Sequence, residues 1–314
     1  MKETGAAIKL ALILFCSANF CLTMLSVSAQ SQQVPAKADG APGSGAVLPL
    51  RQYHEGEKLS YHMKGTNRDR TRTITYEVRA DGVVKKTSDG HYVEEYAWSG
   101  LVRNGAPVEL DPAAASFRQT LSIEPNYPLS VPDLSHVIPL IGPITDLLTF
   151  YADMSVARQG QLAHQGDHYY FKHSAPSSWA DGNYVILGQD SIDFEVTLTA
   201  VNPSDGTLSL KVRHVPPEKP QISLPAEWMR APVADTPNNW VQVSKTADGK
   251  FTAAIGKEKF DVELKVNLAN GRIVSGSIDN PVEVIERECA DAALNSCGEP
   301  ARYQIRRQIE IDID

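Results

Sequence analysis

The sequence predicts a mainly β protein, in which a large curved antiparallel sheet or half-barrel carries a bent apolar helix pair on its concave face. Three observations support this fold class. Polar and apolar residues alternate with a period of two over most of residues 53–314, Asp-Gly and Asn-Gly pairs separate the alternating runs, and residues 132–157 have helical spacing instead. One apolar and one polar face per strand is typical of antiparallel sheets rather than of strands buried between helices.

The alternating runs mark the expected strands of what we treat as a single domain. In two of them, one face is formed by Tyr92, Glu94, Tyr96 and Trp98 and by Phe117, Gln119, Leu121 and Ile123, respectively. In the last run, one side carries Tyr303, Ile305, Arg307, Ile309, Ile311 and Ile313, and the other side is polar. The expected hairpin turns are Asp81-Gly82, Asp89-Gly90, Asp205-Gly206, Asp248-Gly249 and Asn270-Gly271.

Residues 132–157 interrupt the strand pattern with apolar residues at helical spacing. Pro132 stands near the start of a first helix and Gly142-Pro143 breaks the pattern, so we expect two helical pieces with a hinge between them. Asp146 and Asp153 lie off the apolar stripe of the second piece. That stripe, which we expect to face the sheet, consists of Ile144, Leu147, Leu148 and Tyr151.

Residues 1–29 have the pattern of an export signal and are not expected to belong to the fold. Lys2 and Lys9 precede an apolar run over residues 10–27, and small residues occupy the cleavage-site positions before Gln30. We therefore expect a periplasmic or secreted protein without a transmembrane segment after cleavage. An uncleaved single anchor is the alternative, because the run approaches membrane-spanning length.

Two further segments have compositions that do not favour a packed core. Residues 30–52 are rich in Pro, Gly, Ala, Ser and Gln, which predicts a disordered linker, with order beginning near Tyr53. Residues 216–237 contain six prolines, which excludes a central strand and predicts a long irregular loop. This loop is either a contact surface for a partner or a strap held on the sheet by Trp228.

The charge balance limits the classes of partner. The chain has 30 basic and 38 acidic residues, and residues 1–29 contain two Lys and one Glu, so the mature chain has 28 and 37, a net charge of −9. This acidity argues against nucleic acid, which requires a clustered basic surface. The sequence also lacks a nucleophile elbow, a phosphate-binding loop and a dinucleotide-binding motif, so we expect no cofactor.

Two cysteines follow the export signal, Cys289 and Cys297. In an oxidising compartment, a pair at this spacing predicts a structural disulfide that closes a short loop, worth about 2 to 3 kcal/mol. Two free thiols are the alternative.

The remaining candidate sites are weak. His164, His168 and His173 are the best metal-ligand candidates, but residues five apart on one strand point to opposite faces, so we expect no metal site. Paired carboxylates of a hydrolase are conceivable only among Asp181, Asp190 and Asp193, which look like turn residues. Three arginines are expected to form cross-strand pairs with Glu286, Glu288 and Glu310: Arg287, Arg306 and Arg307.

Two features resemble known exported proteins. The run Glu55-Gly56-Glu57-Lys58-Leu59-Ser60-Tyr61 resembles the start of the first strand in some uncharacterised bacterial exported β-proteins. An exported antiparallel sheet interrupted by an apolar helix resembles the periplasmic lipoprotein-carrier half-barrels of the LolA/LppX type. That resemblance covers residues 53–314 and implies a lipid-sized apolar cavity between sheet and helices. It rests on architecture, without a shared residue motif, and transfers no binding residue.

We therefore expect a non-enzymatic envelope protein that binds a lipid or another apolar ligand between the sheet and the helices. The residues expected to line this site are Ile144, Leu147, Leu148, Tyr151, Tyr96 and Trp98. One alternative is a structural or interaction protein with a solid core, which contacts a partner through residues 216–237. The other alternative is a hydrolase without a recognisable motif.

Overall fold

The structure is a computed structural model. It describes residues 48–125, 127–130, 132–134, 136–174, 178–181, 184–188, 191–215, 240–246, 248–291 and 294–313. The expected export signal, most of the expected linker and the proline-rich segment 216–237 lie outside the described residues. Of the helices that are described, none is both long enough and apolar enough to span a bilayer.

The described chain folds into one open antiparallel sheet of fifteen strands with few helices, which confirms the predicted fold class. The helical elements are α2 (Pro112–Ser116), the 3₁₀ helix η1 (Ile138–Leu140) and α3 (Ile141–Ala157). The strands are β1 (Lys58–Arg68), β2 (Thr73–Lys86), β3 (Tyr92–Arg103), β4 (Ala106–Pro107), β5 (Arg118–Leu121), β6 (His168–Ser174), β7 (Ser178–Asp181), β8 (Tyr184–Gly188), β9 (Ser191–Asn202), β10 (Thr207–Val215), β11 (Trp240–Lys245), β12 (Phe251–Glu258), β13 (Asp261–Asn267), β14 (Ile273–Cys289) and β15 (Ala301–Ile313).

Two sets of strands share one edge of β14. From β4 the sheet runs through β3, β2, β1 and β15 to β14, and it continues as β13-β10-β9-β6 beside one end of β14 and as β12-β11-β8-β7 beside the other. Glu258 pairs with Val282 and Asp261 with Asp279, so the register is the same on both sides of the break between β12 and β13. The sheet therefore has two halves joined by unbroken strands.

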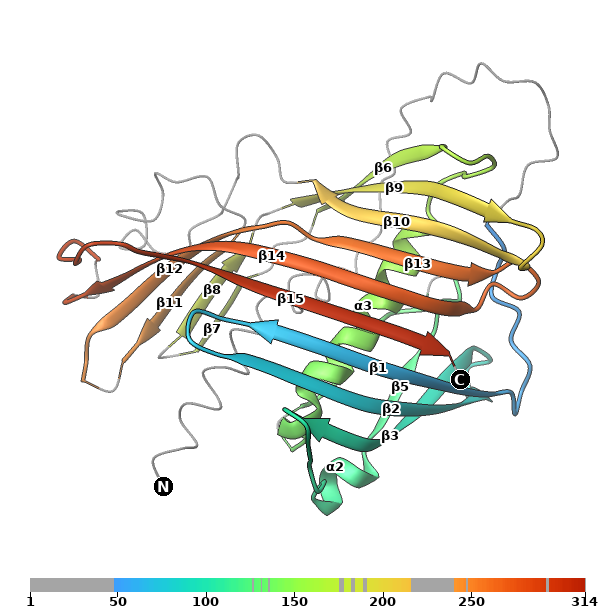
Figure 1. Ribbon diagram of the computed structural model, residues 1–314, viewed down its shortest axis with the longest axis horizontal. Helices are drawn as coiled ribbons and strands as arrows, with labels where there is room; N and C mark the ends of the chain where they lie inside the picture. The colour runs from blue at the N-terminus through green and yellow to red at the C-terminus, as the bar shows by residue number, and fades with distance from the viewer. Residues whose placement is uncertain are drawn as a thin grey trace.

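We call the line between these halves the crease. It passes through Lys259 and Phe260, between β12 and β13, and crosses β14 and β15 at the paired residues Asn280 and Arg307. Figure 1 shows β7, β8, β11 and β12 turned away from the direction of β9, β10 and β13. We call the strands β7, β8, β11 and β12, with the adjoining ends of β14 and β15, the small half, and the remainder with α3 the large half.

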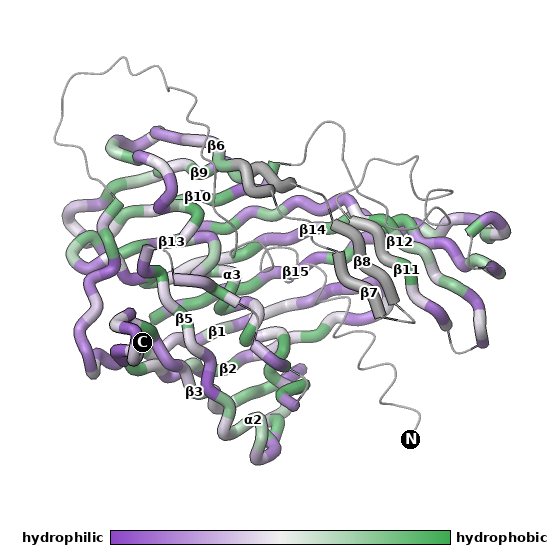
Figure 2. Tube along the Cα trace, turned by 180° about the vertical axis from the view of Figure 1, so that it is seen from behind, coloured by the Kyte–Doolittle hydropathy of each residue, from purple (hydrophilic) through white to green (hydrophobic). Residues whose placement is uncertain are grey.

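Helix α3 lies on the concave face of the large half. It is behind the sheet in Figure 1 and in front of it in Figure 2, where hydrophobic and hydrophilic residues alternate along the strands. Its backbone approaches β13, β10, β9 and β5 most closely. Fourteen of its residues are buried, so this helix is enclosed rather than amphipathic.

The expected helix pair is in fact one helix preceded by a 3₁₀ turn. Residues 132–134 are not helical, and α3 begins at Ile141, so Gly142 and Pro143 lie in its first turn. Proline is tolerated there, because the first N–H groups of a helix have no intrahelical partner. The predicted hinge at Gly142-Pro143 is therefore wrong.

Glycines within strands make room for tyrosine rings on the concave face. Gly65 pairs with Tyr76 and Gly82 with Tyr96 across neighbouring strands, and a Cβ at either glycine would overlap the ring opposite. This explains why the predicted turn at Asp81-Gly82 is wrong, since both residues lie inside β2. The other four predicted turns are confirmed, with positive φ at Gly90, Gly206, Gly249 and Gly271.

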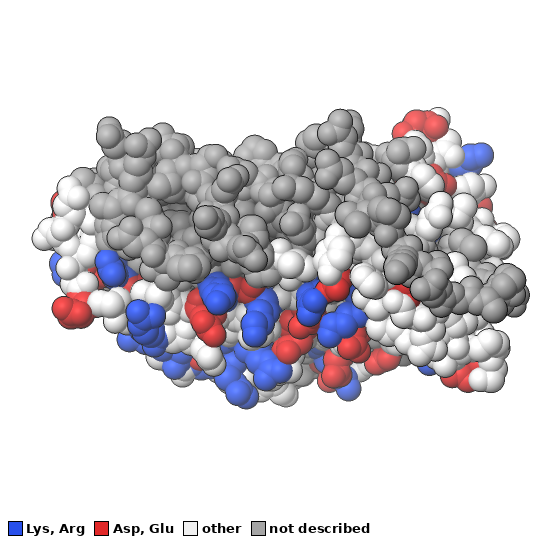
Figure 3. All heavy atoms as spheres, turned by 90° about the horizontal axis from the view of Figure 1, so that it is seen from above, with Lys and Arg blue, Asp and Glu red and all other residues white. Residues whose placement is uncertain are grey.

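The outer face carries charges of both signs. Figure 3 shows Lys and Arg interspersed with Asp and Glu over the described part of this view. Arg306 donates from Nε and an Nη atom to Asp279, at 2.8 and 3.0 Å, and His62 contacts Glu77 at 2.6 Å. The pairing expected for Arg306 is thus wrong in its partner, and Arg307 points to the other face. Such exposed pairs contribute little to stability.

The small half has its own small core. A second apolar cluster forms on the face of β14 opposite to the main core, and its buried members are Val243, Ala253, Ile255, Cys289 and Leu294. The disulfide between Cys289 and Cys297, predicted from the sequence, is present with an S–S distance of 2.07 Å. It joins the end of β14 to Cys297 beside this cluster.

Candidate functional site

The expected ligand-lining residues lie together, but inside the packed core. All six are between 0 and 3% exposed: Ile144, Leu147, Leu148, Tyr151, Tyr96 and Trp98. The hydroxyls of Tyr96 and Tyr151 are 2.6 Å apart, so the strand and helix residues of this set meet across the interior. In the described state these side chains pack against each other rather than lining an open surface.

The layer between α3 and the middle strands consists of large side chains. The largest fully buried ones include Tyr61, Met63 and Tyr96 from the strands and Phe150 and Tyr151 from α3. Tyr61 donates to the carbonyl oxygen of Ile273 at 2.9 Å. Long side chains therefore span the distance between the helix and the central strands.

One end of α3 is held by a buried carboxylate, Glu94 of β3. This group accepts hydrogen bonds from Arg51 Nε at 3.0 Å, from the Tyr96 hydroxyl at 2.8 Å and from the Tyr151 hydroxyl. The side chains of Glu94 and Arg51 are each 1% exposed. Burial raises the pKa values of Tyr96 and Tyr151 well above their ordinary value, so both phenols act as donors. We call Glu94, Arg51, Tyr96 and Tyr151 the glutamate anchor.

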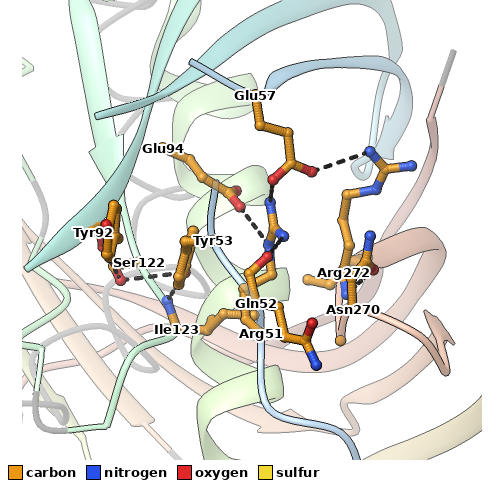
Figure 4. Close-up of polar contacts among 12 residues, drawn as sticks. Arg51, Gln52, Tyr53, Glu57, Tyr92, Glu94, Ser122, Ile123, Asn270 and Arg272 are labelled. Atoms are coloured by element: carbon orange, nitrogen blue, oxygen red, sulfur yellow. Dashed lines mark hydrogen bonds and ion pairs between the residues drawn. The ribbon is translucent and has the colours of Figure 1, made fainter. Parts of the chain in front are cut away.

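Arg51 connects this anchor to the surface (Figure 4). Its guanidinium lies 4.6 Å from the ring centroid of Tyr53 and donates to Glu57 at 2.9 Å, and Glu57 is 3.6 Å from Arg272. Residues 48–52, which we expected to belong to a disordered linker, are therefore part of the fold. Composition alone did not show that a single arginine in this segment has a buried counter-charge.

The end of α3 is tied to the same segment. Arg158, directly after the helix, donates to the carbonyl oxygens of Ile123 at 2.7 Å and Pro49 at 3.0 Å. Burial lowers the pKa of Arg158 to about 10. Tyr53 stacks on Tyr92 and accepts a hydrogen bond from the Ile123 backbone N–H at 2.9 Å, and burial raises its pKa to about 12.

The other part of α3 is held by a buried aspartate. The Tyr76 hydroxyl donates to Asp146 Oδ2 at 2.6 Å, and Arg307 of β15 forms an ion pair with Asp146 Oδ1. The side chains of Arg307 and Asp146 are 4% and 1% exposed. We call Asp146, Tyr76 and Arg307 the aspartate anchor. Both the pairing expected for Arg307 and the expectation that Asp146 lies away from the sheet are wrong.

A second buried aspartate on α3 contrasts with Asp146. Asp153 is seven residues further along, on the same helix face, and is 1% exposed. Its Oδ2 atom has no hydrogen-bond partner among the described residues. Burial raises the pKa of Asp153 well above its ordinary range, because the charged form is desolvated.

Polar side chains are also buried at the crease. Asn280 Nδ2 donates to Glu258 Oε1 at 2.7 Å and to the Lys259 carbonyl at 2.8 Å, and burial raises the pKa of Glu258 to about 7. The His214 ring stacks on Phe260 with centroids 4.4 Å apart, and burial lowers the pKa of His214 to about 3. These groups lie where the two halves meet.

Of the weak metal candidates, the described histidines His164 and His168 have different neighbours. His164 contacts Asp167 at 3.6 Å, whereas the His168 ring packs edge-on against Tyr170. His168 and His173 both belong to β6, but the side chain of His173 lies outside the described residues. No group of three His, Cys, Asp or Glu residues within the described parts of the chain is arranged to hold a metal ion.

The two anchors were missed by the sequence analysis, although a signal was present. Glu94 and Arg307 occupy positions on the apolar faces of their strands, and Asp146 interrupts an apolar helix. A charged residue at a core position needs a partner, but the alternation does not say which one.

Comparison with protein-family models, curated proteins and solved structures gave no match, so the function is inferred from the sequence and the geometry.

Proposed function

We propose that this is a non-enzymatic exported envelope protein that binds an apolar ligand or acyl chain between α3 and the concave face of the sheet. One observation supports the proposal. The apolar helix α3 lies on the apolar concave face of the sheet and is held there by two buried ion pairs, which involve Glu94 and Asp146. Export is proposed from the pattern of residues 1–29.

Buried ion pairs are a weak means of stabilising a core. Their desolvation offsets much of the attraction, and apolar side chains of similar size frequently stabilise a protein as well or better. Such pairs do fix the position of one element against another. When the two elements separate, the charged groups of the pair are hydrated again. Separation exposes the apolar faces of α3 and the sheet to water, which is unfavourable unless an apolar ligand covers them. The anchors therefore suit a helix that leaves its seat when a ligand arrives.

The second candidate function is an interaction protein with a solid core. It is favoured by the 0 to 3% exposure of the six expected lining residues. Its proposed contact surface, residues 216–237, lies outside the described residues.

Photo-crosslinking in the native compartment distinguishes the two. The Phe150 side chain extends from α3 to Gly276 of β14. We propose to replace Phe150 with p-benzoylphenylalanine in exported protein and to search for a covalent lipid adduct by mass spectrometry. Phe251, which packs on the second apolar cluster, is the matched control. We expect an adduct at Phe150 and none at Phe251. Absence of adducts at both positions, together with no lipid in native mass spectra, would favour the solid-core protein.

A further inference from the structure

The aspartate anchor is a carboxylate-binding site whose donors all come from the sheet. Arg307 is supplied by β15 and Tyr76 by β2, while the bound carboxylate, that of Asp146, is supplied by α3. An arginine with a phenol is a strong combination for holding an anionic oxygen, because the guanidinium bond is charge-assisted.

The strand residues are arranged for this role without help from the helix. Arg307 lies in the apolar row of β15, where Ile309 and Ile311 are each 1% exposed. Tyr76 lies over Gly65, and a Cβ at that position would displace its ring. With α3 displaced, the concave face would present a guanidinium and a hydroxyl beside a continuous apolar surface.

We infer that Arg307 and Tyr76 bind the anionic head group of the ligand, and that Asp146 occupies this head-group site while α3 is seated. The inference rests on the proposed function and specifies its ligand class, an acyl chain with a carboxylate or phosphate head. Asp146 is then an intramolecular competitor, and ligand binding exchanges one anion on Arg307 for another.

Charge explains why an anionic head is required. A neutral ligand that displaced α3 would separate Arg307 from the charge of Asp146 in an apolar setting, which is strongly unfavourable. An anionic head group would form a new ion pair with Arg307, and the released Asp146 carboxylate would be hydrated. Asp153 Oδ2 has no hydrogen-bond partner among the described residues, so Asp153 is a natural control for a buried aspartate that does not compete.

The test compares laurate with methyl laurate, which share a chain and differ in head-group charge. Delipidated full-length protein is titrated with each by isothermal calorimetry. In Asp146→Asn, removal of the competitor should tighten laurate binding at least about tenfold, while methyl laurate should change less than about twofold. Asp153→Asn should change neither by more than about twofold.

The double variant Asp146→Asn/Arg307→Met keeps the test decisive if the single variant does not fold, because it removes the charges together. It should bind laurate and methyl laurate with similar affinity, whereas the wild type should prefer laurate. Dodecyl phosphate, tested alongside, separates a phosphate head from a carboxylate head as the better partner of Arg307.

Two results overturn the inference in distinguishable ways. Equal binding of both lauryl ligands by the wild type, or an unchanged preference in the double variant, means that Arg307 does not read the head group, and the proposed apolar site remains. If no ligand binds to any variant, the proposed function itself is wrong.

Discussion

The two halves of the sheet are stabilised by different means. The small half has a second cluster of five buried residues and a disulfide that joins the end of β14 to the loop before β15. The large half has a continuous core that encloses α3 and contains two buried ion pairs, Arg51–Glu94 and Arg307–Asp146.

Among the residues whose side chains are described, the cluster of the small half is much smaller than the main core. A small core contributes little stability, and a covalent link compensates by limiting the unfolded chain. A large core can accommodate buried charges, because many apolar contacts offset their desolvation. The two buried ion pairs that fix α3 are therefore found beside the larger core.

The largest effect should come from a charge placed in the large half at a residue that belongs to neither anchor. Leu148 is fully buried on α3, so Leu148→Asp should destabilise the protein by at least about 4 kcal/mol and abolish cooperative thermal unfolding. Leu148→Met, which conserves volume, should cost less than about 1.5 kcal/mol. An unchanged melting curve for Leu148→Asp would show that α3 does not pack as described.

The next effect should come from breaking the glutamate anchor. Among the described residues, Glu94→Gln leaves Arg51 with Glu57 as its one anionic partner, and it should lower the free energy of unfolding in urea by about 3 kcal/mol. Glu95→Gln is the matched control on the opposite face of β3, where Glu95 pairs with the half-exposed Lys85 at 2.6 Å. That change should cost less than about 1 kcal/mol. Equal losses would argue against a special role for the buried pair.

Removing the disulfide should affect the small half selectively. Cys289→Ser/Cys297→Ser should lower stability by about 2 to 3 kcal/mol, the value expected for a closed loop of this size. Hydrogen exchange should become faster in β12 and at the start of β15, with little change in α3. Comparable loss of protection in α3 would mean that the halves unfold as one unit.

The free energy of unfolding should depend on pH through Glu258, which lies at the crease between the two halves. Burial raises the pKa of Glu258 from 4.5 to about 7, so the folded state keeps a proton that the unfolded state releases. Its contribution to stability is present below pH 4.5 and is lost as the pH rises to about 7. Denaturation of Glu258→Gln over this range should show a weaker decline with pH than the wild type. An identical decline would assign the pH dependence to other groups.

The smallest effect is expected on the outer face. Arg306 and Arg307 are neighbours on β15, but Arg306 pairs with Asp279 on the exposed side. Arg306→Ala should leave the melting temperature unchanged within error, because exposed ion pairs contribute little. Arg307→Ala should lower it clearly, since Asp146 would be left buried without its counter-charge. Similar melting temperatures for the two variants would contradict the burial of Arg307.

Features determined by local chemistry were predictable from the sequence. The period of two marks strands because neighbouring side chains of a strand face opposite ways, and it placed β3, β5 and β15 correctly. The disulfide was predictable because its cysteines are eight residues apart. Four glycine turns followed from the preference of glycine for positive φ.

Features that depend on distant partners were not predictable. Asp146 and Arg307 are far apart in the sequence, and only the register of the sheet brings β15 and α3 together. Gly82 resembled a turn residue, since its neighbour is an aspartate, whereas its role is to leave room for the Tyr96 ring on the next strand. The crease is marked in β14 by Pro281, which donates no ladder hydrogen bond, but β14 and β15 cross it without a break, so the period of two did not show it.

The two strands that cross the crease have a mechanical consequence. From Asn280 to Cys289, β14 extends nine residues beyond the crease, a length of about 30 Å at roughly 3.3 Å per residue. The small half therefore has the geometry of a lever whose pivot row contains Arg307, the residue that holds Asp146. A rotation of about 6° at the pivot displaces the disulfide tip by about 3 Å, and a force applied at the tip exerts its torque on the row that anchors α3.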